Sequence, residues 1–277
     1  MTNFIRIFLI VSFLSVNSGG FCGTKPNNMI IVLDLSDRLL NQGQQEKDQA
    51  AIMAMFEKFE QSVRQQFFVK SKDVFSIVII PQRGSKLNAD GFEKRLRLDM
   101  NNIAISEKNR RFMAFKSQLP TVLNSLYGQA QKGSRPSDYF GVDIWQFFNE
   151  SLNNYLSPIA NNSMLVLTDG YFDFENDSHT VHSKNRFTSS RFMSSLTGVN
   201  WKKNAESSNL GIYPIQNKLM PVVIIIAGFH AKSTDQFELD KLKYFWHKWL
   251  NESGINQFKL ISNVNASQFG SSIKNAI

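Results

Sequence analysis

Four continuous apolar runs constrain the fold of this chain more than any other feature of its sequence. They are MIIVL at 29–33, VFSIVII at 74–80, MLVL at 164–167 and VVIIIAGF at 222–229. A strand with one face in water alternates apolar and polar residues, whereas a strand buried on both faces is an unbroken apolar run. Strands of the second kind belong to parallel sheets that are covered by helices. The sequence therefore predicts an α/β protein with a mostly parallel central sheet.

Helical patterns lie between and after these runs. Apolar residues recur every three or four positions in the segments 44–68, 107–130, 144–156 and 235–250, and a terminal helix is expected from 266. Strands that alternate with helices predict a doubly wound sheet with helices on both faces.

Two further segments are predicted to be strands. The segment GFEKRLRLDM at 91–100 alternates apolar and charged residues, which is typical of an edge strand with one wet face. We expect it to be the one antiparallel edge strand of the sheet. A last strand is expected at 257–262.

A single domain is expected over 29–277, after a short linker at 22–28. The stretch 170–220 is rich in Ser, Asn and aromatic residues and is too long for a routine connection between core strands. We interpret it as an insertion over one end of the sheet. Its aromatic residues suit either a protein-binding surface or a small satellite core. These residues are Phe187, Trp201 and Tyr213.

The N-terminus has the layout of a secretory signal. Arg6 precedes the apolar run IFLIVSFL at 7–14, and small residues follow. The run is shorter than the ~20 residues that a membrane-spanning helix needs. We therefore expect a signal peptide over 1–21.

The single cysteine, Cys22, follows this segment. It resembles the lipid-attachment cysteine of bacterial lipoproteins, although Phe21 stands where that family has a small residue. Two outcomes are open: earlier cleavage that leaves Cys22 as a free thiol, or cleavage before Cys22 with lipid anchoring. We expect an exported, membrane-anchored protein of the bacterial cell envelope, in the periplasm or on the outer surface.

The chain carries a formal net charge of +8, and its basic residues are spread widely. Such a surface favours acidic partners of any kind. No interleaving of aromatic and basic residues matches a nucleic-acid-binding motif, so no nucleic-acid partner is expected. With 42% hydrophobic and 19% charged residues, the composition is that of an ordinary globular chain.

Polar side chains follow the first and third apolar runs. Asp34 follows the first run, with Ser36 two residues further on, and Asp169 follows the third. The carboxyl ends of parallel strands meet at one edge of a sheet, and ligands bind there where the strand order reverses. If the two strands are neighbours, both carboxylates face one crevice. Hard oxygen ligands of this kind suit Mg²⁺ or a similar divalent ion.

A loop before the helix at 144–156 is expected to reach the same edge of the sheet. Its sequence, GSRPSDYFG at 133–141, contains three side chains with oxygen atoms that could complete the site. These are Ser134, Ser137 and Asp138.

The segments DLSDR at 34–38 and LTDG at 167–170 resemble motifs of the von Willebrand factor A family. In that family a first strand ends in Asp-x-Ser-x-Ser, a middle loop supplies Thr or Ser, and a later strand ends in Thr-Asp-Gly. Together they form a metal-ion-dependent adhesion site. The resemblance covers roughly 29–277 and implies that a bound metal bridges to an acidic residue of a protein partner. It implies as ligands Asp34, Ser36, Ser137 and Asp169, with Ser134 or Asp138 as alternatives in the middle loop.

The third position of the first motif departs from the family pattern. Arg38 stands where the family has serine, and a guanidinium cannot ligate a cation. Two buried carboxylates without a positive charge would repel each other. Either a divalent ion or Arg38, paired with Asp34 or Asp169, should therefore lie between them. Asp37, between the two motif positions, is a further residue that could modify the site.

We therefore expect an exported protein-binding module in which the insertion shapes partner choice. A metal-free scaffold of the same fold, with Arg38 neutralising the site, is the first alternative. The second is a hydrolase that uses Asp34, since phosphatases of the haloacid dehalogenase type also begin with a strand that ends in aspartate. Those enzymes need Asp-x-Asp, but position 36 is serine and Asp37 has the wrong parity. A binding role is thus expected, and catalysis is not.

Overall fold

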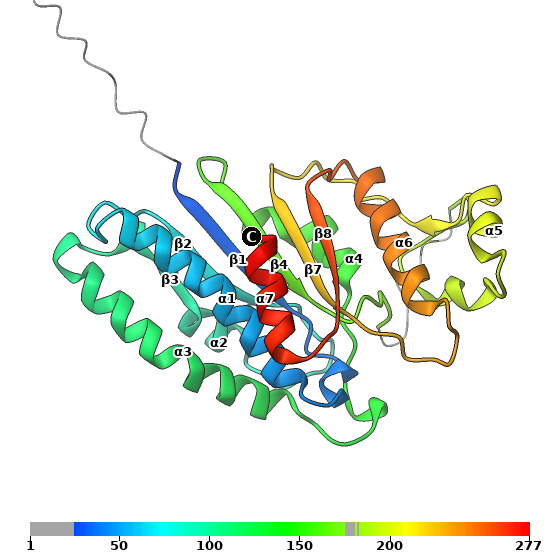
Figure 1. The fold of residues 1–277 in the computed structure, drawn as a ribbon, viewed down its shortest axis with the longest axis horizontal. Helices are drawn as coiled ribbons and strands as arrows, with labels where there is room; N and C mark the ends of the chain where they lie inside the picture. Colours follow the sequence, from blue (N-terminus) through cyan, green and yellow to red (C-terminus); the bar gives the residue numbers. More distant parts are fainter. Residues whose placement is uncertain (1–24, 175–180, 182) are drawn as a thin grey trace, which may run out of the picture.

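A six-stranded mixed sheet forms the centre of the protein in a computed structural model that describes residues 25–174, 181 and 183–277 (Figure 1). All neighbouring strands are parallel except the third in the chain, which is an antiparallel edge strand. The predicted sheet is therefore confirmed. In spatial order its strands are β3 (Arg97–Asp99), β2 (Val74–Ile79), β1 (Asn27–Leu33), β4 (Asn161–Leu167), β7 (Val223–Phe229) and β8 (Phe258–Ser262).

Helices cover both faces of this sheet, as predicted (Figure 1). In chain order they are α1 (Gln44–Gln65), α2 (Ala89–Arg95), α3 (Lys108–Ala130), α4 (Ile144–Gln146), α5 (Trp201–Ser207), α6 (Glu238–Glu252) and α7 (Ala266–Ala276). Side chains of α1, α3 and α7 share one hydrophobic core with one face of the sheet, and those of α4 and α6 share a second core with the other face.

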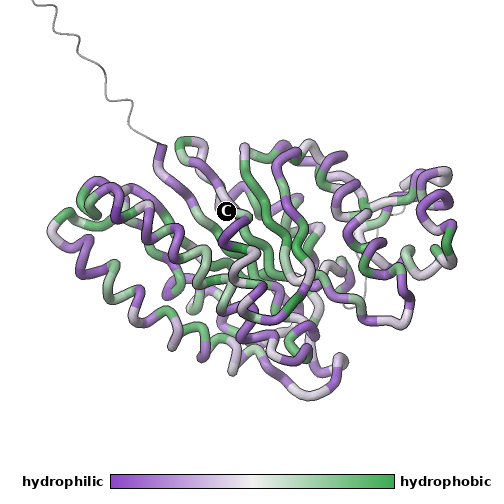
Figure 2. The backbone as a smooth tube through the Cα atoms, viewed as in Figure 1, coloured by the Kyte–Doolittle hydropathy of each residue, from purple (hydrophilic) through white to green (hydrophobic). Residues whose placement is uncertain are grey.

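The alternation of side chains along β1 explains the two cores. Ile31 and Leu33 belong to the core on the α1 side, whereas Ile30 and Val32 belong to the core on the α6 side. Successive side chains of a strand point to opposite faces, so a strand between two helical layers must be apolar at every position. Figure 2 shows hydrophobic residues concentrated in the central strands, while hydrophilic and hydrophobic residues alternate along the surrounding helices.

Most of the predicted elements are confirmed, with small shifts at their ends. The helix predicted over 144–156 is irregular: α4 continues into a π-helical turn, Phe147–Ser151, and a 3₁₀ turn, Leu152–Asn154. The wide turn lets two adjacent phenylalanines, Phe147 and Phe148, both lie in the core.

The edge-strand prediction for 91–100 was largely wrong, because α2 occupies most of that segment and only Arg97–Asp99 pairs with β2. Phe92 and Leu96 are both buried. Residues four apart lie on one face of a helix, so this spacing suits α2 as well as it suits a strand.

The described part of the insertion packs against α6. It contains α5 and a two-stranded parallel sheet of β5 (Arg186–Phe187) and β6 (Gly211–Ile212). The Trp201 ring lies edge-on to Tyr244, with centroids 5.5 Å apart, and the Trp249 indole donates a hydrogen bond of 2.9 Å to the Tyr213 carbonyl. Trp201 is only 7% exposed. These contacts favour the satellite-core interpretation of the insertion aromatics.

The predicted signal peptide and Cys22 lie outside the described residues, as do 175–180 and 182 of the insertion. Export and lipid attachment therefore stay predictions. Within the described part of the chain, no helix has the length and apolar character that crossing a membrane requires.

Candidate functional site

The sheet register brings the polar residues after β1, β4 and β7 to one edge. Leu33 pairs with Leu167, and Leu167 pairs with Ala227. Backbone hydrogen bonds extend the alignment beyond the strands, since the Asp34 N–H donates to Leu167 at 3.1 Å and the Thr168 N–H donates to Ala227 at 3.0 Å. The strand order reverses between β1 and β4, which is the usual place for a ligand in an open parallel sheet.

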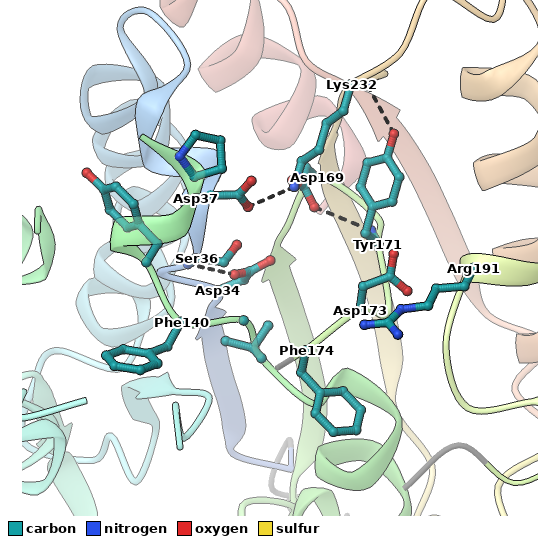
Figure 3. A pocket seen from close by; sticks show the side chains of 14 residues that line it. Asp34, Ser36, Asp37, Phe140, Asp169, Tyr171, Asp173, Phe174, Arg191 and Lys232 are labelled. Atoms are coloured by element: carbon teal, nitrogen blue, oxygen red, sulfur yellow. Dashed lines mark hydrogen bonds and ion pairs between the residues drawn. The ribbon is translucent and has the colours of Figure 1, made fainter. Parts of the chain in front are cut away.

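A cavity of about 350 Å³ lies at this edge (Figure 3). The structure brings Asp34, Ser36 and Asp169 together in its wall, as the strand pattern predicted, and Asp37 joins them. Ring side chains from the loop before α4 and from the loop after β4 line other parts of it. These are Tyr139, Phe140, Tyr171 and Phe174.

Asp34 is held by the fold at both carboxylate oxygens. Oδ1 accepts a hydrogen bond of 2.9 Å from the Ser36 N–H, and Oδ2 accepts one of 2.8 Å from the Thr168 hydroxyl. Burial raises the pKa of Asp34, the neighbouring charge of Asp169 raises it further, and the positive charge of Arg38 opposes the rise. Asp34 is thus a buried carboxyl group with one hydrogen bond to the protein at each oxygen.

Lys232 supplies a positive charge that the sequence analysis did not identify. Its Nζ atom lies 2.8 Å from Asp169 Oδ2 and 2.8 Å from Asp37 Oδ1 (Figure 3). Burial opposes the charged form of Lys232, but the carboxylates of Asp169 and Asp37 outweigh it and raise the lysine pKa above its ordinary value. The one signal in the sequence was a lysine three residues beyond the last residue of β7.

Arg38 does not lie between the site carboxylates, which corrects the counter-ion prediction. Its guanidinium pairs with Asp48 through two hydrogen bonds of 2.8 Å and otherwise donates to the backbone carbonyl of Asp34 at 2.9 Å. Arg38 belongs to the 3₁₀ turn Asp37–Leu40, and its side chain meets an acid of α1. No sequence pattern indicated that Asp48, in the first turns of an amphipathic helix, would be buried.

The middle loop does not bring its expected ligands to the cavity. Ser134 and Ser137 are exposed, and Asp138 pairs with Arg135 at 3.2 Å. Of this loop, Pro136, Tyr139 and Phe140 line the cavity instead. The loop therefore contributes ring and apolar surface to the wall.

Asp173 and Arg191, both in the insertion, also line the cavity, and neither was predicted as a site residue. Asp173 Oδ1 accepts hydrogen bonds of 2.9 Å from the Ser190 N–H and from the Ser190 hydroxyl. The Arg191 side chain points toward Asp173 (Figure 3). This side of the cavity is thus built by residues far apart in the chain, which no local motif marks.

The donor set as arranged does not fit Mg²⁺. A magnesium ion requires near-octahedral oxygen ligands at 2.0–2.1 Å, but the ammonium of Lys232 lies between the carboxylates of Asp37 and Asp169. Both oxygens of Asp34 already accept hydrogen bonds from the protein. Among the described residues, no group of three His, Cys, Asp or Glu side chains is placed to hold a metal ion.

Comparison with known proteins does not assign the chain to a family. No protein-family model matches the chain, and no curated protein matches it either. A solved structure that is similar to it is the pilus adhesin SpaC of Lactobacillus rhamnosus GG in its open conformation, with a TM-score of 0.44 and 11% sequence identity. The match covers 91% of this chain and 30% of the adhesin chain, so this chain spans about a third of that protein's length. A likeness this low carries no argument, and the von Willebrand factor A-like assignment stays a prediction.

Proposed function

We propose that this chain is an exported protein-binding module that receives a basic side chain of its partner in the cavity at the carboxyl end of the sheet. The observation that carries the proposal is the charge balance of the cavity wall. Four aspartates of the wall supply four negative charges when ionised, and Lys232 and Arg191 supply two positive charges, which leaves an excess of two negative charges. The aspartates are Asp34, Asp37, Asp169 and Asp173. The raised pKa of Asp34 reduces that excess to one when its carboxyl group is protonated.

The same balance argues against an acidic partner residue. That prediction depended on a metal ion to bridge two carboxylates, and the cavity as built does not fit one. Without a divalent ion, a partner carboxylate would meet several like charges and be repelled. Asp37 is the acid that a partner can reach, because its side chain is 26% exposed and that of Asp169 only 2%.

The ring side chains suit a long basic side chain as well. Four ring residues, Tyr139, Phe140, Tyr171 and Phe174, are among those that line the cavity. The aliphatic stem of a lysine or arginine can pack on such rings, and its charge can lie over a ring face. A cavity with apolar walls and a few placed polar groups is typical of a recognition site.

Binding is better supported than hydrolysis by Asp34. A carboxylate nucleophile must be ionised and free to attack. Asp34 instead accepts one hydrogen bond from Ser36 in its own loop and one from Thr168 after β4, and burial raises its pKa. These features are those of a structural carboxyl group.

Titration with capped amino acids tests the charge preference of the cavity directly. We expect N-acetylarginine amide to shift amide resonances around Asp37 and Lys232 in NMR spectra, and N-acetylglutamate amide not to shift them. Asp37→Asn should weaken the arginine response. Asp99→Asn is the matched control, because Asp99 is also a partly exposed, ion-paired aspartate but lies on β3. Stronger binding of the glutamate probe than of the arginine probe would contradict the proposal and indicate an acidic partner side chain.

Export with lipid anchoring through Cys22 is part of the proposal and is supported by the N-terminal pattern. Mass spectrometry of the full chain expressed in a bacterium should find residues 1–21 removed and a lipid on Cys22. Cys22→Ser should yield protein without the lipid. A mature N-terminus upstream of an unmodified Cys22 would contradict anchoring and leave export standing.

A further inference from the structure

Lys232 is fixed in the cavity by more than its two carboxylate contacts. Its backbone N–H donates a hydrogen bond of 3.0 Å to the Tyr171 hydroxyl, and its ammonium lies 4.8 Å from the centroid of the Tyr171 ring. The next residue, Ser233, donates its N–H to Glu238 at 2.7 Å. Hydrogen bonds thus hold the backbone around Lys232, and Tyr171 and the two carboxylates hold its side chain.

Its ammonium joins two loops that are far apart in the sequence. Asp37 follows β1 and Asp169 follows β4, and each lies 2.8 Å from the same nitrogen (Figure 3). These are the loops that would supply the first and last ligands of the predicted metal site. The positive charge therefore lies beside the predicted metal ligands and contacts one of them, Asp169.

An ammonium and a divalent ion compete for these carboxylates. A lysine ammonium has three N–H donors and carries its charge permanently tethered to the chain. A metal ion that approached Asp37 and Asp169 would meet a like charge in a partly desolvated place, where screening by water is weak. Displacing the ammonium would also break both ion pairs and the contact with Tyr171.

We infer that Lys232 is the resident cation of this cavity, taking by its side chain the role that a divalent metal ion would otherwise have. The inference rests on the same cavity as the proposed function and adds how the positive charge there is supplied. Two results are expected. The wild-type protein has no Mn²⁺ or Mg²⁺ site in this cavity. A variant without the ammonium gains affinity for a divalent ion at the acidic side chains that remain.

Isothermal titration of the full chain with Mn²⁺ and with Mg²⁺ tests this inference. We expect no saturable binding by the wild type and by Lys232→Arg, which keeps the charge. Lys232→Met should bind Mn²⁺ saturably, with a Kd at least about tenfold below the highest Mn²⁺ concentration at which the wild type shows none, a difference of about 1.4 kcal/mol. Adding Asp169→Asn to Lys232→Met should abolish the gain.

Lys116→Met is the matched control. Lys116 is also a partly exposed lysine in contact with a carboxylate, Glu60 at 2.7 Å, but it lies on α3. This variant loses the same charge from the protein as a whole and should bind Mn²⁺ as the wild type does. A gain in both lysine variants would mean that net charge alone controls binding, and would overturn the role of Lys232.

Saturable Mn²⁺ binding by the wild type at this cavity would overturn the inference without any variant, so the test does not depend on the folding of Lys232→Met. Failure of a folded Lys232→Met to gain affinity would also overturn it. The proposed function can fail separately. In that case the arginine probe would not shift the amide resonances around the cavity, while Lys232→Met would still gain affinity for Mn²⁺. The two results distinguish the partner preference from the source of the cation.

Discussion

Two cations lie near the carboxyl ends of β1 and β4, and their surroundings differ sharply. The Arg38–Asp48 pair is fully buried, at 0% exposure for both side chains. Lys232 is 37% exposed and faces a cavity. The arginine therefore belongs to the framework that holds the first loop in place, whereas the lysine belongs to the surface that a ligand can reach.

The number of partners separates the two regions further. Asp48 accepts hydrogen bonds from Arg38, from the Gln44 amide at 2.9 Å and from the Tyr127 hydroxyl at 2.7 Å. Asp37 and Asp169 surround a single ammonium. Hydrogen bonds stabilise a buried charge, and Asp48 of the framework accepts more of them from side chains than either acid of the cavity pair.

The largest expected effect is that of breaking the buried pair. Asp48→Ala leaves the Arg38 guanidinium buried without a carboxylate, which should lower the free energy of unfolding by about 3–5 kcal/mol. Urea denaturation followed by circular dichroism measures it. A loss below about 1 kcal/mol would show that the pair behaves like a surface contact and would remove the contrast.

Tyr127→Phe sharpens the comparison by removing one donor and leaving the ion pair. The Tyr127 hydroxyl is a donor to Asp48, and burial raises the pKa of this tyrosine so that it stays protonated. A hydrogen bond to a charged group contributes about 1.5–3 kcal/mol, so we expect a loss of that size in the same assay. If stability is unchanged, the network around Asp48 does not need this donor.

Lys232→Met should cost less, about 1–2 kcal/mol, because water reaches part of the ion pair. High salt offers an independent check, since screening acts on exposed charges more than on buried ones. At about 1 M NaCl the cost of Lys232→Met should shrink while that of Asp48→Ala persists. Equal salt dependence of the two variants would contradict the division into framework and cavity.

The smallest effect is expected at a pair on the outer surface. Lys274 lies 3.0 Å from Glu57, and both side chains are largely exposed. Lys274→Ala should change the free energy of unfolding by less than about 1 kcal/mol. This variant sets the baseline of the series, and a larger loss would mean that charge number rather than burial controls stability.

Hydrophobic patterning predicted the fold well. Unbroken apolar runs located the central strands, and periodic apolar residues located α1, α3 and α6, because burial on one or both faces leaves a direct record in the sequence. The terminal helix α7 was expected as the element that completes the alternation of strands and helices. The strand prediction for 91–100 was largely wrong because the spacing of Phe92 and Leu96 fits the period of a helix as well as that of a strand. The irregular turns after α4 had no signal of their own.

The site was predicted only in part. Asp34, Ser36 and Asp169 were found because they directly follow strands, and strand ends in a parallel sheet converge. Lys232, Asp173 and Arg191 were missed, since they come from loops whose course depends on tertiary packing. Arg38 was recognised as a departure from the family motif, and Asp34 or Asp169 was considered as its partner. Its partner is instead Asp48, because the first loop turns back onto α1.

The sequence by itself determined the mixed sheet, its helical layers and the edge at which the polar residues gather, because these follow from which side chains must avoid water. Tertiary structure alone decided which cation meets which carboxylate. Ion pairs depend on distances of a few ångströms between segments far apart in the chain, and apolar periodicity carries no information on that scale. Tertiary packing therefore placed Arg38 in the buried framework and Lys232 in the cavity.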